Sequence, residues 1–298
     1  MTVSSASAVE IRRDLSADGL REAILDDFAA SATRRRALPG ERRVDDRGLL
    51  AYVSDVNSPD VNEVARARLG DRGDAAAVDA AIDEVLALFD WRPFLWWLRP
   101  DDTPPDLAER LVRHGLVFLD DIPGMAMDLA ELADETAAPP PRELDIRPVL
   151  GDADVADFLV VTTQGFPEDW GDGRAIETFA AGMRVIAAEQ DHREPNGAPT
   201  RWIGRVDGRP VATARLHAGA GVAGIYTVVT VEGARRRGYG AAMTRRAMLA
   251  GRDAGLRIAT LQASDSGRGV YERIGFRELC RFRLFESRPI AGAQAGRD

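Results

Sequence analysis

Lysine is missing from this sequence, and all 39 residues counted as lysine or arginine are arginines. The absence excludes a nucleotide-binding P-loop, which places a lysine on the phosphates, and Schiff-base chemistry on a lysine. Protein-kinase chemistry is excluded on the same ground.

Cysteine, histidine and long apolar runs are also scarce. The single cysteine, Cys280, excludes an intrachain disulfide and a multi-cysteine zinc site, and we interpret it as a small hydrophobe in a strand. The three histidines are scattered, so we predict no metal site. No apolar run approaches the roughly 18 residues of a membrane span, and residues 1–14 lack an apolar signal segment. We expect a cytoplasmic protein that does not contact membranes.

The composition is that of an ordinary globular protein, with 45% hydrophobic and 29% charged residues. A formal net charge of -9 makes nucleic acid a poor partner, because phosphate contacts need a basic surface. An acidic surface suits a cationic amine substrate. The length of 298 residues predicts two domains.

A proline-rich segment divides the chain. Pro139, Pro140 and Pro141 are consecutive and favour a stiff, extended connector. We predict a first domain over 1–135, a linker over 136–143 and a second domain over 144–298.

The second half alternates strand and helix patterns. Its predicted strands are 144–149, 201–206, 210–218, 222–231, 257–263 and 276–286, and its predicted helices are 152–164, 173–189, 239–253 and 266–273. The helix at 239–253 has one small and apolar face, formed by Tyr239, Met243, Ala247 and Ala250, which is suited to packing on a sheet.

The first half ends in the same order of elements. A strand at 94–98, a helix at 104–114 and a strand at 115–129 are predicted, preceded by a strand at 61–69 and a helix at 75–89. The stretches 111–116 and 270–276 both read as a helix end, a glycine and an apolar residue that opens a strand. We interpret the two halves as a duplication. The loop 70–74 carries two aspartates that would repel a pyrophosphate, so the first half is expected to bind no cofactor.

The strongest local signal is the segment Arg235-Arg236-Arg237-Gly238-Tyr239-Gly240, which joins a predicted strand to a predicted helix. Glycine allows close approach of the backbone to a ligand. The first turn of the helix offers unpaired N–H groups and a positive dipole end, which together form an anion site. Adjacent arginines add positive charge. A dinucleotide-binding loop is a poorer interpretation, because Ala241, Ala242 and Met243 follow where a third glycine is needed.

The sequence resembles the GNAT (GCN5-related) N-acetyltransferase family at two places. Arg235-x-x-Gly238-x-Gly240 is similar to the family's cofactor-loop motif, and Tyr271-Glu272-Arg273-Ile274-Gly275-Phe276 is similar to its Tyr-Glu-x-x-Gly-Phe segment. The resemblance covers residues 144–288 well and residues 20–132 only through the likeness of the halves. It implies an α+β tandem fold, with a mixed central sheet flanked by helices in each half and acetyl-CoA bound once, in the second half.

The resemblance also implies roles for individual residues. Backbone groups of the strand before the loop hold the pantetheine and the acetyl carbonyl, and the loop amides hold the pyrophosphate. The strand positions are Val228, Val229 and Thr230, and the loop positions are Arg236, Arg237, Gly238, Tyr239, Gly240 and Ala241. Tyr271 is expected to protonate the departing thiolate. Ser264 stands where the family often has an asparagine facing the cofactor, and its shorter side chain departs from that pattern.

The chemistry needs a neutral amine to attack the thioester while a backbone N–H holds the oxyanion. A base or a chain of waters must first take a proton from the substrate ammonium. Glu168, Asp169 and His217 are candidates for this base or for contacts with the acceptor. The alternative interpretation is that Glu168 and Asp169 are solvated loop carboxylates and that His217 is a satisfied strand histidine. The acceptor is expected to be a primary amine of a small molecule or peptide.

Two alternative functions stay open. One is an acetyltransferase similar to mycothiol synthase, which also has a tandem arrangement and acts on an amino-sugar conjugate. The other is a non-catalytic, CoA-binding regulatory protein. The sequence also leaves open whether the chain forms a homodimer.

Overall fold

The computed structural model describes residues 10–33, 40–46, 48–57, 59–70, 74–90, 92–164 and 199–287. The strands are β1 (Arg42–Asp46), β2 (Leu49–Val53), β3 (Glu63–Ala67), β4 (Leu95–Leu98), β5 (Leu116–Asp128), β6 (Asp145–Pro148), β7 (Arg201–Val206), β8 (Arg209–His217), β9 (Ala223–Thr230), β10 (Ile258–Gln262) and β11 (Arg277–Ser287). The helices are α1 (Ala17–Thr33), α2 (Ala75–Phe89), α3 (Leu107–Arg113), α4 (Asp152–Gln164), α6 (Tyr239–Asp253) and α7 (Asp265–Ile274), with 3-10 turns at Pro59–Val61, Leu129–Glu131 and Glu232–Ala234.

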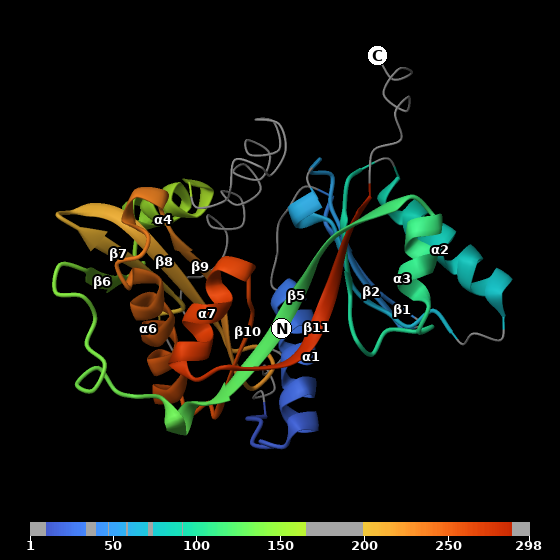
Figure 1. Ribbon diagram of the computed structural model, residues 1–298. Helices are drawn as coiled ribbons and strands as arrows, with labels where there is room; N and C mark the ends of the chain where they lie inside the picture. The colour runs from blue at the N-terminus through green and yellow to red at the C-terminus, as the bar shows by residue number, and fades with distance from the viewer. Residues whose placement is uncertain are drawn as a thin grey trace, which may run out of the picture.

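The described strands form one mixed sheet that runs through both halves of the chain (Figure 1). The strand order is β1-β2-β3-β4-β11-β5-β10-β9-β8-β7-β6. Strand β5, from the first half, lies between β10 and β11 of the second half and is antiparallel to both. Strand β11 in turn lies between β5 and β4. Each half therefore completes its sheet with a strand of the other half.

The order of the strands is symmetric about the β5–β11 pair. On either side of that pair lies a strand, β10 or β4, that is parallel to the next strand outward. The helix that precedes each central strand ends at a glycine with positive φ, Gly115 at 90° and Gly275 at 125°. Both glycines were the matching positions in the two sequence stretches, and the topology is what a duplicated chain would produce.

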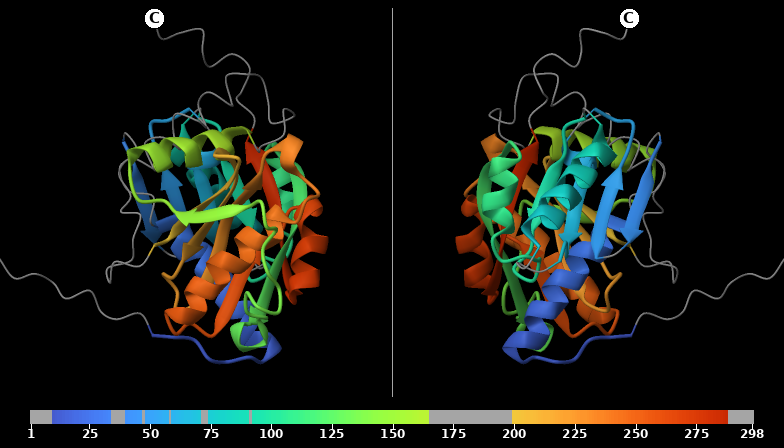
Figure 2. Two further views of the ribbon diagram at one scale, coloured as in Figure 1. Left: turned by 90° about the vertical axis from the view of Figure 1, so that its left-hand side faces the viewer. Right: turned by 90° about the vertical axis from the view of Figure 1, so that its right-hand side faces the viewer.

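Helices cover both faces of the sheet, as the two side views show (Figure 2). Met243 and Ala247 of α6 pack in one core with Leu216 and Leu261, whereas Ile24 of α1 packs in another. Neighbouring residues of β10 divide between these cores, Ala259 on the α6 side and Ile258 on the α1 side. Because side chains alternate along a strand, α1 and α6 lie on opposite faces.

Helix α4 shares the face of α1. Its Phe158 packs with Ile203 of β7, while the adjacent Trp202 belongs to the α6 core. Arg246 of α6 places its guanidinium 5.7 Å from the centre of the Trp202 ring on that other face. The sheet of the second half is thus sandwiched between α6 and α7 on one side and α1 and α4 on the other.

The helix boundaries predicted for α2, α4 and α6 are confirmed. Helix α3 begins at Leu107 and not at 104, because Pro104 and Pro105 lie in a turn that the amide of Leu107 closes onto the Pro104 carbonyl. The predicted helix at 173–189 lies outside the described residues. A turn precedes the three prolines of the linker, where Ala138 donates to the Asp134 carbonyl.

Candidate active site

Strands β9 and β10 diverge soon after they begin to pair. Their parallel ladder contains two residue pairs, Ala223 with Ala259 and Gly224 with Thr260, although β9 continues to Thr230. On its other side β9 stays paired with β8 as far as Thr230. The edge of β9 beyond Gly224 therefore faces a gap, and its backbone groups are available to a ligand that lies between the strands.

A β-bulge in β9 accompanies this divergence. Ala214 of β8 faces two residues of β9, Thr227 and Val228, because the pairing shifts between Thr213 and Arg215. Thr227 has a φ of 52°, which an L-residue rarely adopts. A bulge twists its strand and disrupts the ladder locally. It therefore changes the direction of the backbone from Val228 to Thr230, the positions predicted to contact the cofactor.

The arginine-glycine loop follows β9 and turns sharply into α6. Arg236 and Gly238 both have positive φ, 63° and 81°. The guanidinium Nε of Arg235 donates to the carbonyl of Thr230 at 3.2 Å and closes the turn. Among the described residues, no backbone acceptor is paired with an N–H of residues 236–241. Unpaired amides at the start of a helix, together with the helix dipole, are suited to holding an anion.

The positions predicted for the cofactor are brought together here. Thr230 ends β9 beside the start of α6, where a Cβ on Gly240 would lie 3.6 Å from its hydroxyl oxygen. Arg236 and Arg237 are exposed at the loop. The side chain of Tyr239 is buried and its hydroxyl donates to Glu143 at 3.0 Å, so only its backbone is available to a ligand.

Ser264 and Tyr271 lie at the two ends of α7. The hydroxyl of Ser264 caps this helix by accepting from the amide of Gly267. Tyr271 is partly buried against the α6 core, with its ring 6.0 Å from that of Phe276. Burial raises the pKa of Tyr271 to about 12, so its hydroxyl keeps its proton at neutral pH.

His217 ends β8 on the α1 face, where it contacts a carboxylate that the sequence analysis did not identify. Nδ1 of His217 lies 2.9 Å from Oδ1 of Asp27 in α1. Oδ2 of the same carboxylate accepts from the hydroxyls of Tyr226 and Thr260, each at 2.8 Å. Burial, the largest effect, raises the pKa of Tyr226 well above its ordinary value. One carboxylate thus joins β8, β9 and β10 at the point where the last two diverge.

A signal for Asp27 was present in the sequence. It lies one residue before Phe28 and three after Ile24, which are both buried in the core under α1. A carboxylate on the apolar face of a helix is rarely tolerated unless it has partners. The partners are 190 to 233 residues away in sequence, so this signal does not identify them.

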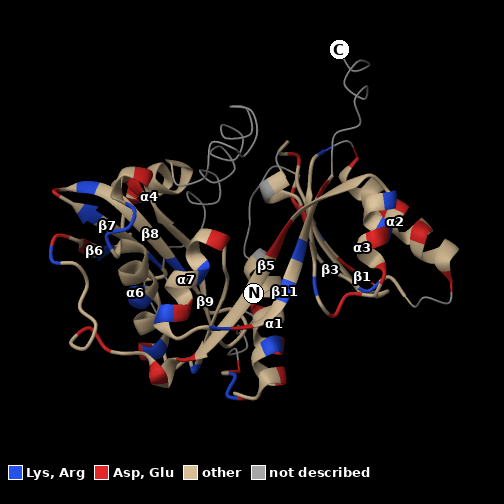
Figure 3. Ribbon diagram, in the orientation of Figure 1, with Lys and Arg blue, Asp and Glu red and all other residues tan. Residues whose placement is uncertain are grey.

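The other predictions have mixed outcomes. Glu168 and Asp169 lie outside the described residues. Asp74, in the acidic loop of the first half, caps α2 by accepting from the amide of Ala77. No cluster of metal-ligating residues and no helix long and apolar enough to cross a membrane occurs in the described ranges. Arginines and acidic residues are interspersed over both halves (Figure 3).

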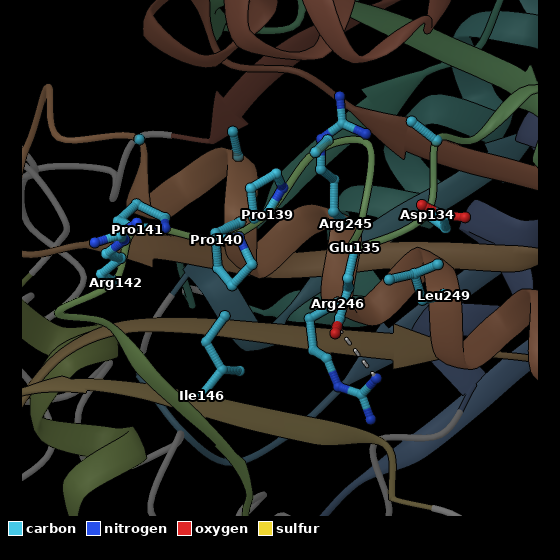
Figure 4. A pocket seen from close by; sticks show the side chains of 15 residues that line it. Asp134, Glu135, Pro139, Pro140, Pro141, Arg142, Ile146, Arg245, Arg246 and Leu249 are labelled. Carbon is cyan, nitrogen blue, oxygen red and sulfur yellow. Dashed lines mark ion pairs between the residues drawn. The ribbon is translucent and has the colours of Figure 1, made fainter.

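A cavity of about 370 Å³ lies between the linker and α6 (Figure 4). Its lining includes Pro139 and Pro140 from the linker and Arg245 and Arg246 from α6, with Arg246 3.9 Å from Glu135. The cavity touches the loop at Gly238 but includes no residue of β10 or α7. It is therefore separate from the gap between β9 and β10.

Comparison with known proteins agrees with this geometry. Residues 161–276 match the family model described as the acetyltransferase (GNAT) family. No curated protein matches the sequence. A GCN5-related N-acetyltransferase from Kribbella flavida is 21% identical, with a TM-score of 0.63, and the match covers 92% of this chain and 95% of that one.

Two further solved structures share the fold. A GCN5-related N-acetyltransferase from Sphaerobacter thermophilus is 17% identical, with a TM-score of 0.52 and coverage of 82% of each chain. A tandem GNAT protein from the clavulanic acid biosynthesis pathway is 13% identical, with a TM-score of 0.51, and the match covers 93% of this chain and 97% of that one. These identities establish a common fold and leave the substrate open.

Proposed function

The chain carries a domain of the acetyltransferase (GNAT) family at residues 161–276, and from this premise we propose that it moves an acetyl group from acetyl-CoA to a primary amine. The observation that carries the proposal is the gap between β9 and β10, which leads to the anion site at the start of α6. An acyl-CoA is long and narrow with a pyrophosphate in its middle, so it needs an open strand edge followed by a phosphate cradle. The acceptor is a small molecule or a peptide.

The residues present fit this donor. The exposed edge of β9 at Val228, Val229 and Thr230 offers the backbone groups that hold an extended amide chain. The amides of residues 236–241 would hold the pyrophosphate, with Arg236 and Arg237 adding charge. Acetyl-CoA supplies the activated thioester. Ser264 keeps its predicted contact with the cofactor in this proposal, although its hydroxyl also caps α7.

Two residue functions support the transfer. A backbone N–H of β9 stabilises the negative charge that develops on the carbonyl oxygen during attack. The hydroxyl of Tyr271 donates its proton to the departing thiolate sulfur, and its raised pKa keeps that proton in place until the thiolate forms. We assign the second half as the catalytic domain and the first half as a related domain without its own cofactor, joined by residues 136–143.

The test is a screen of small amines and peptide N-termini with acetyl-CoA, in which free thiol is measured. Thiol release that depends on an amine supports the proposal. CoA binding without thiol release for any amine would instead favour the regulatory protein that binds CoA without catalysis. Absence of CoA binding would overturn both.

A matched pair of glycine variants locates the site. Gly238 and Gly208 have similar φ values of 81° and 76°, and no backbone crowds either position. Alanine costs similar backbone strain at both, about 1 kcal/mol. Gly238→Ala is expected to weaken CoA binding, measured by calorimetry, whereas Gly208→Ala, in the β7–β8 turn, is expected to leave it unchanged. Equal affinities would show that the loop does not hold CoA.

A further inference from the structure

We propose that Asp27 and His217 form a buried proton-accepting pair for the amine acceptor, with Nε2 of His217 taking the proton and Asp27 positioning the ring. The proposal rests on the proposed function and extends it by naming the base. It also gives the first half a role in the reaction, because Asp27 is supplied by α1.

The first support is the geometry of the pair. Both side chains are fully buried, and the distance of 2.9 Å between Nδ1 and Oδ1 is that of a hydrogen bond. A carboxylate oxygen only accepts, so Nδ1 must carry a proton and donate it. In a neutral ring Nε2 is then an unprotonated acceptor, and the carboxylate stabilises the cation formed when it gains a proton.

The second support is an atom without a partner. Nε2 of His217 is shielded from solvent, yet within the described part of the chain it has no hydrogen-bond partner. A buried polar atom of this kind costs free energy, and native proteins retain few of them. The other atoms of the cluster are satisfied, since Oδ2 of Asp27 accepts from two hydroxyls. Within this cluster, and among the described residues, Nε2 of His217 is the acceptor left without a partner, and it is the atom that a base requires.

The third support is the position of the pair. His217 lies opposite Gly224, which belongs to the last ladder pair before β9 and β10 diverge. Tyr226, two residues further along β9, donates to the same Asp27 and precedes the bulge at Thr227. The pair therefore lies at the closed end of the gap, on the face opposite α6. The donor loop follows the other end of β9, so the pair and the loop lie at opposite ends of this strand.

The charged and titratable groups around the ring come from several elements. Asp27 comes from α1 and Tyr226 from β9, while β10 contributes the neutral Thr260. Arg215, two residues before His217 on β8, acts electrostatically on Tyr226. The ring thus faces one carboxylate directly, and that carboxylate holds Nδ1.

The step is balanced. An N–H bond of the acceptor ammonium breaks, and its proton passes to Nε2 directly or by one bridging water. The freed lone pair forms the C–N bond to the acetyl carbon while the C–S bond breaks, and the thiolate takes a proton from Tyr271. The amide nitrogen then loses its second proton to the tyrosinate, directly or through water, and Tyr271 is restored. The imidazolium then releases its proton to water, and the resting pair is restored.

The first measurement is the tautomer of His217 in the full-length protein. The chain has only three histidines, so a nitrogen NMR spectrum of histidine-labelled protein is simple, and His217→Gln identifies the signal. We expect a proton on Nδ1 and a bare Nε2 at pH 8 in the wild type. A proton on Nε2 would overturn the proposal.

The second measurement is turnover with the fastest amine of the screen. His217→Gln is expected to lower kcat about 100-fold, and Asp27→Asn at least about 10-fold, with KM for acetyl-CoA unchanged. The decline of kcat toward low pH is expected in the wild type and absent from His217→Gln. A protein in which the change was merely structural would lose CoA binding and kcat together and would keep its pH profile.

The control is a second histidine–aspartate pair. Nδ1 of His114 lies 2.9 Å from Oδ1 of Asp83, at the surface of the first half. His114→Gln removes a contact of the same length and is expected to leave kcat unchanged. If Asp27→Asn fails to fold, His217→Gln still decides the matter. An unchanged kcat and pH profile in His217→Gln would overturn this proposal, and the proposed function would still stand if the wild type released thiol in the presence of an amine. If no amine supported thiol release by the wild type, both would be overturned.

Discussion

Leu261 of β10 lies directly opposite Met125 of β5 in an antiparallel pair, although the two residues belong to different halves of the chain. The same interleaving places Leu284 of β11 opposite Trp97 of β4. Separate expression of residues 1–135 and 136–298 should therefore give two unfolded or aggregating chains, because each exposes unpaired strand edges. Co-expression should restore a soluble complex that binds CoA, measured by co-purification and calorimetry.

The control for this experiment is a chain cut after it has folded. A protease site inserted at the exposed residues Thr136 and Ala137 allows the linker to be cleaved in the native protein. The cleaved halves should stay associated and retain CoA affinity. If residues 136–298 alone bound CoA as tightly as the whole chain, the second half would be an independent domain despite the shared sheet.

Tyr271→Phe should lower kcat and leave CoA affinity nearly unchanged. The phenylalanine ring keeps the packing against Phe276 and loses only the hydroxyl that donates the proton. Removing a general acid typically costs about 100-fold in rate or more. Steady-state thiol release and calorimetry measure the two quantities. Because the pKa of Tyr271 is about 12, wild-type kcat should show no loss assigned to this group between pH 7 and 10. A parallel loss of affinity and rate would argue for a packing role alone.

Arg237→Glu should weaken CoA binding and reduce its dependence on salt. Exposed arginine contributes mainly long-range attraction for a phosphate, which salt screens. Arg113→Glu, an equal charge change on the exposed surface of α3, is the control. Calorimetric titrations of CoA at low and high salt should separate the two variants. Equal affinity for CoA in both would exclude Arg237 from the binding site.

Asp102 should make the protein less stable as the pH rises from about 4 to about 7. Its carboxyl accepts from the amides of Ala67 and Arg99, and burial raises its pKa to about 7. An unfolded chain loses this proton near pH 4. Between these values the folded state binds more protons, so its stability falls with rising pH by up to about 1.4 kcal/mol per unit.

The variant Asp102→Asn removes this titration. Urea unfolding at several pH values should show that the free energy of unfolding of the wild type, relative to that of the variant, falls as the pH rises. A constant difference would show that the carboxyl of Asp102 does not titrate in this range.

The sequence predicted the local elements and the cofactor loop better than the architecture. Both ends of helix α6 were predicted correctly, because its small and apolar face and its glycine-rich start lie within one short segment of the sequence. The exchange of β5 and β11 was not predicted, since strand partners depend on contacts more than 100 residues apart. The bulge at Thr227 also has no local signal, because threonine gives no hint of a positive φ.

The individual site residues show the same difference between local and long-range contacts. His217 was named from its place in a strand, but Asp27, which holds it, was missed because it comes from the other half of the chain. Ser264 was assigned to the cofactor by resemblance, whereas locally Ser264-x-x-Gly267 is an N-cap, which the structure shows. Contacts between residues close in sequence, such as the N-cap at Ser264, can therefore be predicted from the sequence. Contacts between distant strands and helices, such as that of Asp27 with His217, cannot.

The central position of β11 has a consequence for how the protein is made. This strand is synthesised after all the other described strands, yet β4 and β5 cannot both be paired until it arrives. While the second half is being translated, β4 and β5 lack the strand that lies between them. Unpaired strand edges in a nascent chain are prone to aggregation. The chain therefore reaches its final strand pairing only after residues 277–287 have been synthesised.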